Sequence, residues 1–212
     1  MSEQRHSGVV STVEQREPLV LASASPRRRE ILSQLGLTFT VIESGVEEPP
    51  PRAVAPATYA AELAARKAAA VVARLRAEGR RVWVLGADTI VVVGGAILNK
   101  PQDDAEAVRM LLALQGRSHE VITAVALRHT GSEPSRALSV RTQVRFRAFD
   151  EVTARRYVAQ GEGRDKAGSY AAQGLGAGLI EALDGSYSNV VGLPASETLV
   201  LLQSVGAVGA WP

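Results

Sequence analysis

The chain has 212 residues, the length of one ordinary domain or two small ones, and 46% of them are hydrophobic. Charged residues make up 22%, and these average hydrophobic and charged fractions exclude wholesale disorder. The 24 basic and 22 acidic side chains leave a formal net charge of only +2, which gives no electrostatic argument for a nucleic-acid surface. The absence of cysteine excludes disulfides, thiolate metal sites and a cysteine nucleophile. No apolar run approaches the ~20 residues of a membrane span and no apolar segment follows the charged N-terminus, so we expect a soluble, cytoplasmic protein without a membrane partner.

Mixed helices and strands are predicted from residue 18 onward, after a polar segment of residues 1–17 that we expect to be a flexible tail. Ser25 followed by Pro26 is typical of a helix N-cap and first helical position, Gly94-Gly95 of a hairpin turn, and Asp150 of a second N-cap. The expected elements are strand 19–22, helix 27–35, strand 39–41, helix 57–78, strand 82–87, hairpin 90–98, helix 104–116, strands 120–127 and 138–149, helix 150–161, strand 179–183 and helix 194–204.

These elements favour an α/β fold. Crossover helices and hairpins both occur between neighbouring strands, which predicts a mixed sheet flanked by helices. There is no internal repeat and no long linker, so we expect one domain over residues 18–206 and a C-terminal tail over residues 207–212.

The helix expected at 27–35 begins with three arginines, Arg27-Arg28-Arg29. The helix dipole disfavours cations at this end by about 0.3–1 kcal/mol each, so they are best explained by an anion that they share with the free backbone amides. The alternative is a solvated basic face in an arginine-rich chain. The preceding turn, which contains Ser23, lies between strand and helix and favours a phosphate site, with Ser23 among the substrate-binding residues.

Acidic residues follow two of the expected strands. Asp88 comes after the buried run 82–87, where open α/β sheets place their ligand crevice. An aspartate there can act as a base or as a metal ligand in the hydrolysis of a phosphate ester or anhydride; a turn or capping role is the alternative. Glu47-Glu48 could offer a second carboxylate to a divalent cation such as Mg²⁺, or could be solvated loop charges.

Only three of the basic residues are lysines: Lys67, Lys100 and Lys166. In a chain that otherwise uses arginine, lysines are candidates for sites that need a compact point charge. The alternative is that these three positions hold lysine rather than arginine by chance.

Several short segments, taken together and in order, resemble the Maf (septum-formation-inhibitor-like) family. They cover the chain from about residue 19 to residue 202. The segments are Leu21-Ala22-Ser23-Ala24-Ser25-Pro26-Arg27-Arg28, Arg66-Lys67-Ala68, Gly86-Ala87-Asp88-Thr89, Asn99-Lys100-Pro101-Gln102-Asp103, Ser118-His119-Glu120-Val121-Ile122-Thr123, Asp165-Lys166-Ala167-Gly168-Ser169-Tyr170 with Gln173-Gly174, and Val191-Gly192-Leu193-Pro194.

The resemblance implies a nucleoside triphosphate pyrophosphatase, which cuts the α–β phosphoanhydride to give a monophosphate and pyrophosphate. It also implies a divalent cation (Mg²⁺ or Mn²⁺), a homodimer, and the bent mixed sheet with two lobes around a cleft that is shared with inosine triphosphate pyrophosphatases. Asp88 matches the catalytic carboxylate, described in the family as the proton acceptor. The positions around the phosphates and the metal are matched by Arg28, Lys67 and Lys100 and, as a metal ligand with Asp88, by Glu47.

Arg27, Thr89 and Gln173 match the positions that distinguish the branch of the family acting on dTTP and UTP. The branch acting on 7-methyl-GTP has a tryptophan at the first of these positions and a glutamate at the last. The neutral amide of Gln173 can donate to a carbonyl and accept from the N3–H of uracil or thymine. We therefore expect dTTP, UTP and modified pyrimidine triphosphates as substrates.

Two other functions remain open from the sequence. A regulatory or nucleic-acid-binding protein of cell division would use the basic segment 74–81, although the balanced net charge argues against a nucleic-acid partner. A phosphomonoesterase with Asp88 as nucleophile would need the Asp-x-Asp spacing, which is missing. His119 is interpreted as a structural histidine rather than a general base.

Overall fold

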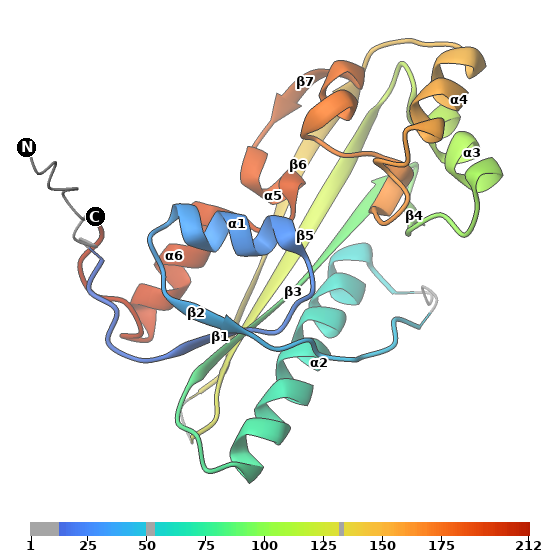
Figure 1. The fold of residues 1–212 in the computed structure, drawn as a ribbon. Helices are drawn as coiled ribbons and strands as arrows, with labels where there is room; N and C mark the ends of the chain where they lie inside the picture. The colour runs from blue at the N-terminus through green and yellow to red at the C-terminus, as the bar shows by residue number, and fades with distance from the viewer. Residues whose placement is uncertain (1–12, 50–53, 132–133) are drawn as a thin grey trace, which may run out of the picture.

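The computed structural model describes residues 13–49, 54–131 and 134–212. These residues form a seven-stranded mixed sheet in the order β2-β1-β3-β5-β6-β7, with β4 paired to β3 outside this path and helices on both faces (Figure 1). The strands are β1 (Leu19–Leu21), β2 (Phe39–Val41), β3 (Trp83–Val93), β4 (Ala96–Leu98), β5 (Ser118–His129), β6 (Arg136–Phe146) and β7 (Ile180–Asp184). The helices are α1 (Pro26–Gln34), α2 (Pro56–Ala77), α3 (Asp104–Leu114), α4 (Glu151–Ala159), α5 (Tyr187–Val191) and α6 (Ala195–Ser204), with 3-10 helices η1 (Ala167–Ser169) and η2 (Gly174–Leu179).

The predicted α/β fold with a mixed sheet is confirmed. The hairpin forms as predicted, with Val93 opposite Ala96, and the Asp150 side chain caps α4 by accepting from the backbone N–H of Thr153. Helix α5 was not predicted, because five residues are too few to show a helical period.

β3 is longer than predicted, and this corrects the placement of Asp88. The strand continues without a break to Val93, because β5 pairs with it residue by residue from Trp83 to Val92. Asp88 therefore lies in the middle of β3 rather than at its end. The edge of β3 opposite β5 is paired by two other strands. β1 pairs with it only as far as Leu85, and β4 pairs with it only from Val91. Between them, residues 86–90 of β3 have no partner strand on this edge among the described residues.

The two faces of the sheet are covered differently, because side chains alternate along β3. On one face Val84 and Ile90 pack beneath α2. The other face has two separate hydrophobic clusters: Trp83 and Leu85 pack with α1 and α6, whereas Val91 packs with α3 and α4. These clusters are the cores of two lobes, which Figure 1 shows at opposite ends of the long strands.

Gly86 allows α2 to approach the sheet closely. A β-carbon at this position would lie 2.4 Å from the carbonyl oxygen of Ala64 and 2.7 Å from the backbone nitrogen of Ala68, inside van der Waals contact. The helix backbone therefore rests directly on the strand. Lys67 precedes Ala68 on the helix, and Asp88 follows Gly86 by two residues on the same face of the strand, so this contact brings the two side chains together.

The expected terminal tails are corrected where the structure describes them; residues 1–12 lie outside the described residues. Residues 13–17 pair with the C-terminal segment: the Glu14 N–H donates to the Ala210 carbonyl at 3.0 Å, and Gln15 and Val208 form an antiparallel bridge. Ala207 and Val208 are buried in the hydrophobic cluster beneath α1 and α6, and Val13 packs against it. Each segment is too short for its own periodicity to indicate this pairing.

The basic segment 74–81 is engaged within the fold. Arg74 donates to the backbone carbonyl of Glu43, and Arg76 donates to the carbonyls of Thr130 and Gly131 at 2.7 and 2.8 Å. These guanidinium groups therefore hold neighbouring loops. Across the described ranges, no helix combines the length and the apolar character needed to cross a membrane.

Candidate functional site

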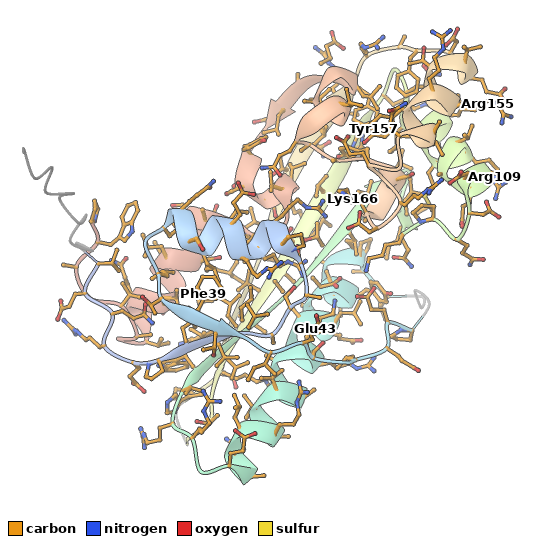
Figure 2. The ribbon with its side chains drawn as sticks, viewed as in Figure 1. Phe39, Glu43, Arg109, Arg155, Tyr157 and Lys166 are labelled. Atoms are coloured by element: carbon orange, nitrogen blue, oxygen red, sulfur yellow. The ribbon has the colours of Figure 1, made fainter. Side chains whose placement is uncertain are left out.

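A cavity of about 360 Å³ lies between the two lobes, beside the unpaired edge of β3. Figure 2 labels Glu43 and Lys166, which line the cavity from the loop after β2 and from the segment before η1. The predicted residues that line it are Ser23, Arg27, Arg28, Lys67, Asp88, Thr89, Lys100 and Gln173. Residues up to 150 positions apart in the sequence thus share one cavity, including the predicted phosphate-binding arginines and the predicted catalytic carboxylate.

Lys67 lies between two carboxylates in this cavity. Its Nζ donates to Asp88 Oδ1 at 2.6 Å and to Glu48 Oε1 at 2.7 Å. Asp88 is 5% exposed and Lys67 is 8% exposed, so solvent screens their interaction only weakly.

The two carboxylates have opposite pKa shifts. Burial raises the pKa of Asp88 above its usual value, although the Lys67 charge and hydrogen bond act against this. For Glu48, burial also acts upward, but the hydrogen bond and charge of Lys67, with the charges of Lys100 and Arg28, outweigh it and lower the pKa. Asp88 is therefore the carboxylate better prepared to accept a proton.

Glu48, and not Glu47, faces the cavity, which corrects the predicted metal-ligand position. The Glu47 side chain is exposed and does not line the cavity; its backbone carbonyl accepts from Arg66 at 3.5 Å. Both glutamates are exposed and belong to the irregular segment after β2, so what separates them is that Glu48 lines the cavity and contacts Lys67. The sequence could not tell which of the two would do so.

The carboxylates of Asp88 and Glu48 fit a divalent cation. They already converge on one cation, the Lys67 ammonium, and their oxygens are the ligand type that Mg²⁺ prefers. Mg²⁺ is commonly held by one or two carboxylates together with substrate phosphates and water, rather than by an all-protein cage. The described residues contain no group of three or more His, Cys, Asp or Glu side chains able to hold a metal by themselves. A cation at this site would therefore share its ligands with phosphate.

Arg28 connects the walls of the cavity. Its Nε donates to the Gly192 carbonyl at 2.8 Å, its Nη1 to Ser23 Oγ at 3.1 Å and its Nη2 to Thr89 Oγ1 at 3.0 Å. Thr89 Oγ1 also lies 2.9 Å from Thr123 Oγ1. Ser23 and Thr89, both predicted to bind substrate, thus hold the Arg28 guanidinium, and three separate segments of the chain are fixed around it.

The N-terminus of α1 faces this cavity. Ser25 occupies the N-cap as predicted, but its side chain makes no capping hydrogen bond. The first N–H groups of a helix have no intrahelical partner, so those of Arg27 and Arg28 are available to an anion. With the Arg27 side chain also lining the cavity, this end of α1 can receive a phosphate group.

His119 lies outside the cavity, in agreement with a structural role. It is 2% exposed, its Nε2 is 2.8 Å from the Tyr170 hydroxyl, and its ring packs edge-on against Phe146. Burial lowers the pKa of His119 to about 4, so the ring is neutral at physiological pH. Its effect on the cavity is indirect, through Tyr170, which lines it.

Similarity to known proteins extends over most of the chain. The family described as Maf-like protein matches residues 18–205. The chain belongs to the Maf family. Its relatives include proteins named dTTP/UTP pyrophosphatase from Pelotomaculum thermopropionicum (47% identical, covering 89% of this chain and 96% of the relative), Alcanivorax borkumensis (49%, covering 87% and 94%) and Geobacter sulfurreducens (48%, covering 90% and 97%).

A crystal structure of a nucleoside-triphosphatase / dITP/XTP pyrophosphatase from Mycobacterium abscessus matches this Maf family member with a TM-score of 0.44 at 14% identity, covering 88% of this chain and 94% of that one. This degree of similarity does not show a common fold, so the shared fold with inosine triphosphate pyrophosphatases stays a prediction.

Two residues that shape this Maf family site were not predicted from the sequence: Tyr59, which lines the cavity, and Asn189, which does not line it but is hydrogen-bonded to β5. Tyr59 lines the cavity, and its hydroxyl donates to the Pro49 carbonyl at 2.7 Å; its spacing of eight residues from Lys67 places both on one face of α2, which is a signal the sequence does contain. Asn189 is fully buried, and its side-chain oxygen accepts from the Thr123 backbone N–H at 3.1 Å. No local pattern indicates that long-range contact.

Proposed function

We propose that this chain is a nucleoside triphosphate pyrophosphatase that hydrolyses dTTP, UTP and modified pyrimidine triphosphates to the monophosphate and pyrophosphate. The observation that carries the proposal is the cavity that places Asp88 and Lys67 beside the α1 N-terminus and its arginines. The names of relatives that are 47–49% identical to this chain agree with it.

In the proposed reaction, a water molecule attacks the α-phosphorus and its oxygen forms the new P–O bond. The bond from the α-phosphorus to the bridging oxygen breaks, and pyrophosphate leaves. Asp88 takes the proton from the attacking water; Lys67 occupies Oδ1, so we assign the proton to Oδ2. The raised pKa of Asp88 brings its basicity closer to that task than an exposed aspartate would be.

The cations of the cavity stabilise the departing charge. The free amides at the α1 N-terminus and the Arg27 side chain contact the phosphates, and Lys100 adds a point charge from the segment after β4. Arg28 holds the turn before α1, strand β3 and the end of α5 together through its bonds to Ser23, Thr89 and Gly192. A divalent cation held by Asp88 and Glu48 would supply Lewis-acid stabilisation of the phosphates when bound.

The Gln173 side chain is proposed to recognise the base. Its amide offers one donor and one acceptor group, which match the O4 and N3–H of uracil and thymine. Thr89, which the resemblance also places at a specificity position, acts through its bond to Arg28 in this arrangement.

The direct test measures pyrophosphate released from a panel of nucleoside triphosphates by the purified protein, with Asp88→Asn beside it. We expect UTP and dTTP to be hydrolysed fastest, and the variant to lose about 10²–10⁴-fold in kcat while it still binds UTP, because the side chain keeps its shape and loses its basicity. Near-normal turnover by the variant would show that Asp88 is not the base. Absence of pyrophosphate with every nucleotide would overturn the proposed activity itself.

A matched pair tests which glutamate serves the cation. Glu48→Gln should weaken Mn²⁺ binding in the presence of a UTP analogue with a methylene group in place of the α–β bridging oxygen, which cannot be hydrolysed there, by at least about tenfold, because the amide oxygen is a neutral ligand, whereas Glu47→Gln should leave it unchanged. Electron paramagnetic resonance of free Mn²⁺ measures this without turnover. A loss confined to the Glu47 variant would contradict the placement of Glu48.

A further inference from the structure

Gln173 lies in a segment with few side chains to fix it. It occupies the N-cap position of η2, between Ala171-Ala172 and Gly174, and lines the cavity. Alanine and glycine offer little packing surface, and glycine leaves the backbone conformationally free. The backbone on either side of Gln173 is held by the buried Ala171 and Ala172, of which Ala172 belongs to the hydrophobic cluster with α1 and α6, and by hydrogen bonds.

Those hydrogen bonds come from Glu162 and Tyr157. The Glu162 carboxylate accepts from the backbone N–H of Leu175 at 2.9 Å through Oε1 and from that of Gly176 at 2.8 Å through Oε2. The Tyr157 hydroxyl donates to Glu162 Oε2 at 2.7 Å and accepts from the Ala171 N–H at 3.0 Å. The two side chains thus hold the backbone on both sides of Gln173.

The glycines of this segment are required by the same contacts. A β-carbon on Gly174 would lie 2.0 Å from Glu162 Oε1, and one on Gly176 would lie 2.1 Å from the Ala171 carbonyl oxygen and 2.7 Å from the Tyr157 hydroxyl. Gly174 also has φ +70°, in the left-handed region that favours glycine. The segment therefore wraps around a carboxylate of its own chain, and successive N–H groups close on it as they do around a bound anion.

The charge states suit this arrangement. Burial raises the pKa of Glu162, but the Tyr157 hydrogen bond and the two backbone N–H groups outweigh it, so the pKa is lowered and the group is ionised. Burial and the adjacent carboxylate raise the pKa of Tyr157, so its hydroxyl keeps its proton and donates. Tyr157 is 6% exposed, and neither side chain lines the cavity.

We infer that Tyr157 and Glu162 are positioning residues that set base selectivity by fixing the Gln173 segment without touching the nucleotide. This rests on the proposed function, in which Gln173 reads the base. Figure 2 shows Tyr157 on α4, in the lobe that also carries Lys166. The phosphate chemistry belongs to Asp88 and Lys67, so their contribution should be common to every nucleotide and independent of this pair.

The test uses Tyr157→Phe, which removes only the hydroxyl, and Glu162→Gln, which removes the charge and places a donor against backbone donors. The readout is the ratio of kcat/KM for UTP to that for CTP, which differ at the edge of the base. We expect the ratio to fall about tenfold, the equivalent of one hydrogen bond, with kcat/KM for CTP within about twofold of the parent value. Glu151→Gln, at the exposed start of α4, is the control and should change neither value.

The same substitutions in a Gln173→Ala background separate positioning from a merely structural role. If the pair acts through Gln173, Tyr157→Phe should not change the ratio further in that background. An equal loss for both nucleotides, or an unchanged ratio in the Tyr157 and Glu162 variants, overturns the inference.

Hydrogen exchange adds a measurement that needs no turnover. The Leu175 and Gly176 amides should exchange at least about tenfold faster in Glu162→Gln than in the parent protein. Unchanged protection of these amides overturns the inference even in an active protein. Two other outcomes overturn the proposed base recognition instead: a parent protein with equal kcat/KM for UTP and CTP, or a ratio of these values that is unchanged in Gln173→Ala. The two failures are therefore distinguishable.

Discussion

Lys67→Met provides a quantitative test of the carboxylate–ammonium cluster. The substitution keeps an unbranched side chain but removes both hydrogen bonds and the charge that Asp88 and Glu48 share. Breaking a buried ion pair by deleting one partner costs about 3–5 kcal/mol, because the remaining charge is left buried and uncompensated. At about 2–4 °C per kcal/mol for a chain of this size, the melting temperature should fall by about 10 °C at neutral pH.

The loss of stability in Lys67→Met should depend on pH with a defined sign. Burial already raises the pKa of Asp88 in the folded protein, and without Lys67 it rises further. The folded state then binds its proton more tightly than the unfolded chain does, so stability falls as the pH rises through the raised pKa. Destabilisation should therefore be largest at pH 7–8 and smaller at pH 5, as measured by urea unfolding at each pH.

Two comparisons make this result decisive. Lys67→Met combined with Asp88→Asn removes both members of the pair and should recover at least about half of the lost stability. Lys100→Met changes an exposed lysine of the same cavity and should alter stability by no more than about 0.5 kcal/mol. A loss in Lys67→Met below about 1 kcal/mol, or one that is equal at pH 5 and pH 8, would refute the reasoning.

Two further predictions concern the support of the site. Gly86→Ala should lower the free energy of unfolding, measured in urea, by about 1–3 kcal/mol and should reduce kcat, because the new methyl group forces α2 away from β3. Gly178→Ala, which adds a methyl group in open space, is the control and should change neither value. Equal effects of the two substitutions would contradict the close contact. His119→Gln should make the free energy of unfolding less dependent on pH in the acid range. The pKa of His119 is lowered to about 4 in the folded protein, so the unfolded chain binds more protons between about pH 4 and 6.5. The parent protein should therefore lose up to about 3 kcal/mol as the pH falls through that range, and the variant should not. Identical slopes of unfolding free energy against pH in the two proteins would disprove the histidine assignment.

Local signals predicted most of the fold, and tertiary pairing accounts for what they missed. The hairpin turn at Gly94-Gly95 and the N-cap at Asp150 have residue preferences that operate over a few positions, and both appear as predicted. Asp88 was placed at a strand end because Asp88-Thr89 interrupts the apolar run. The continuous pairing with β5 carries β3 through this interruption, and no signal within the strand itself could show that.

The site shows the same division. Arg28 and Lys67 could be singled out by residue type and position, and both line the cavity. Glu47 and Glu48 are identical in type and adjacent, so only the path of the loop decides which faces inward. The bonds of Arg28 to Thr89 and Gly192 span 61 and 164 positions, and such contacts follow from the fold rather than from local pattern.

The continuity of β3 also constrains how the cleft can change shape. β3 carries Trp83 in one lobe and Val91 in the other, and ten consecutive residue pairs with β5 cross the boundary between them. A hinge would need a flexible joint at this boundary, but here a paired sheet occupies it, so rotating one lobe against the other would require bending or breaking the ladder. Adjustment to a nucleotide therefore falls to segments at the rim, such as residues 43–48 after β2, while the distance between the two cores stays fixed.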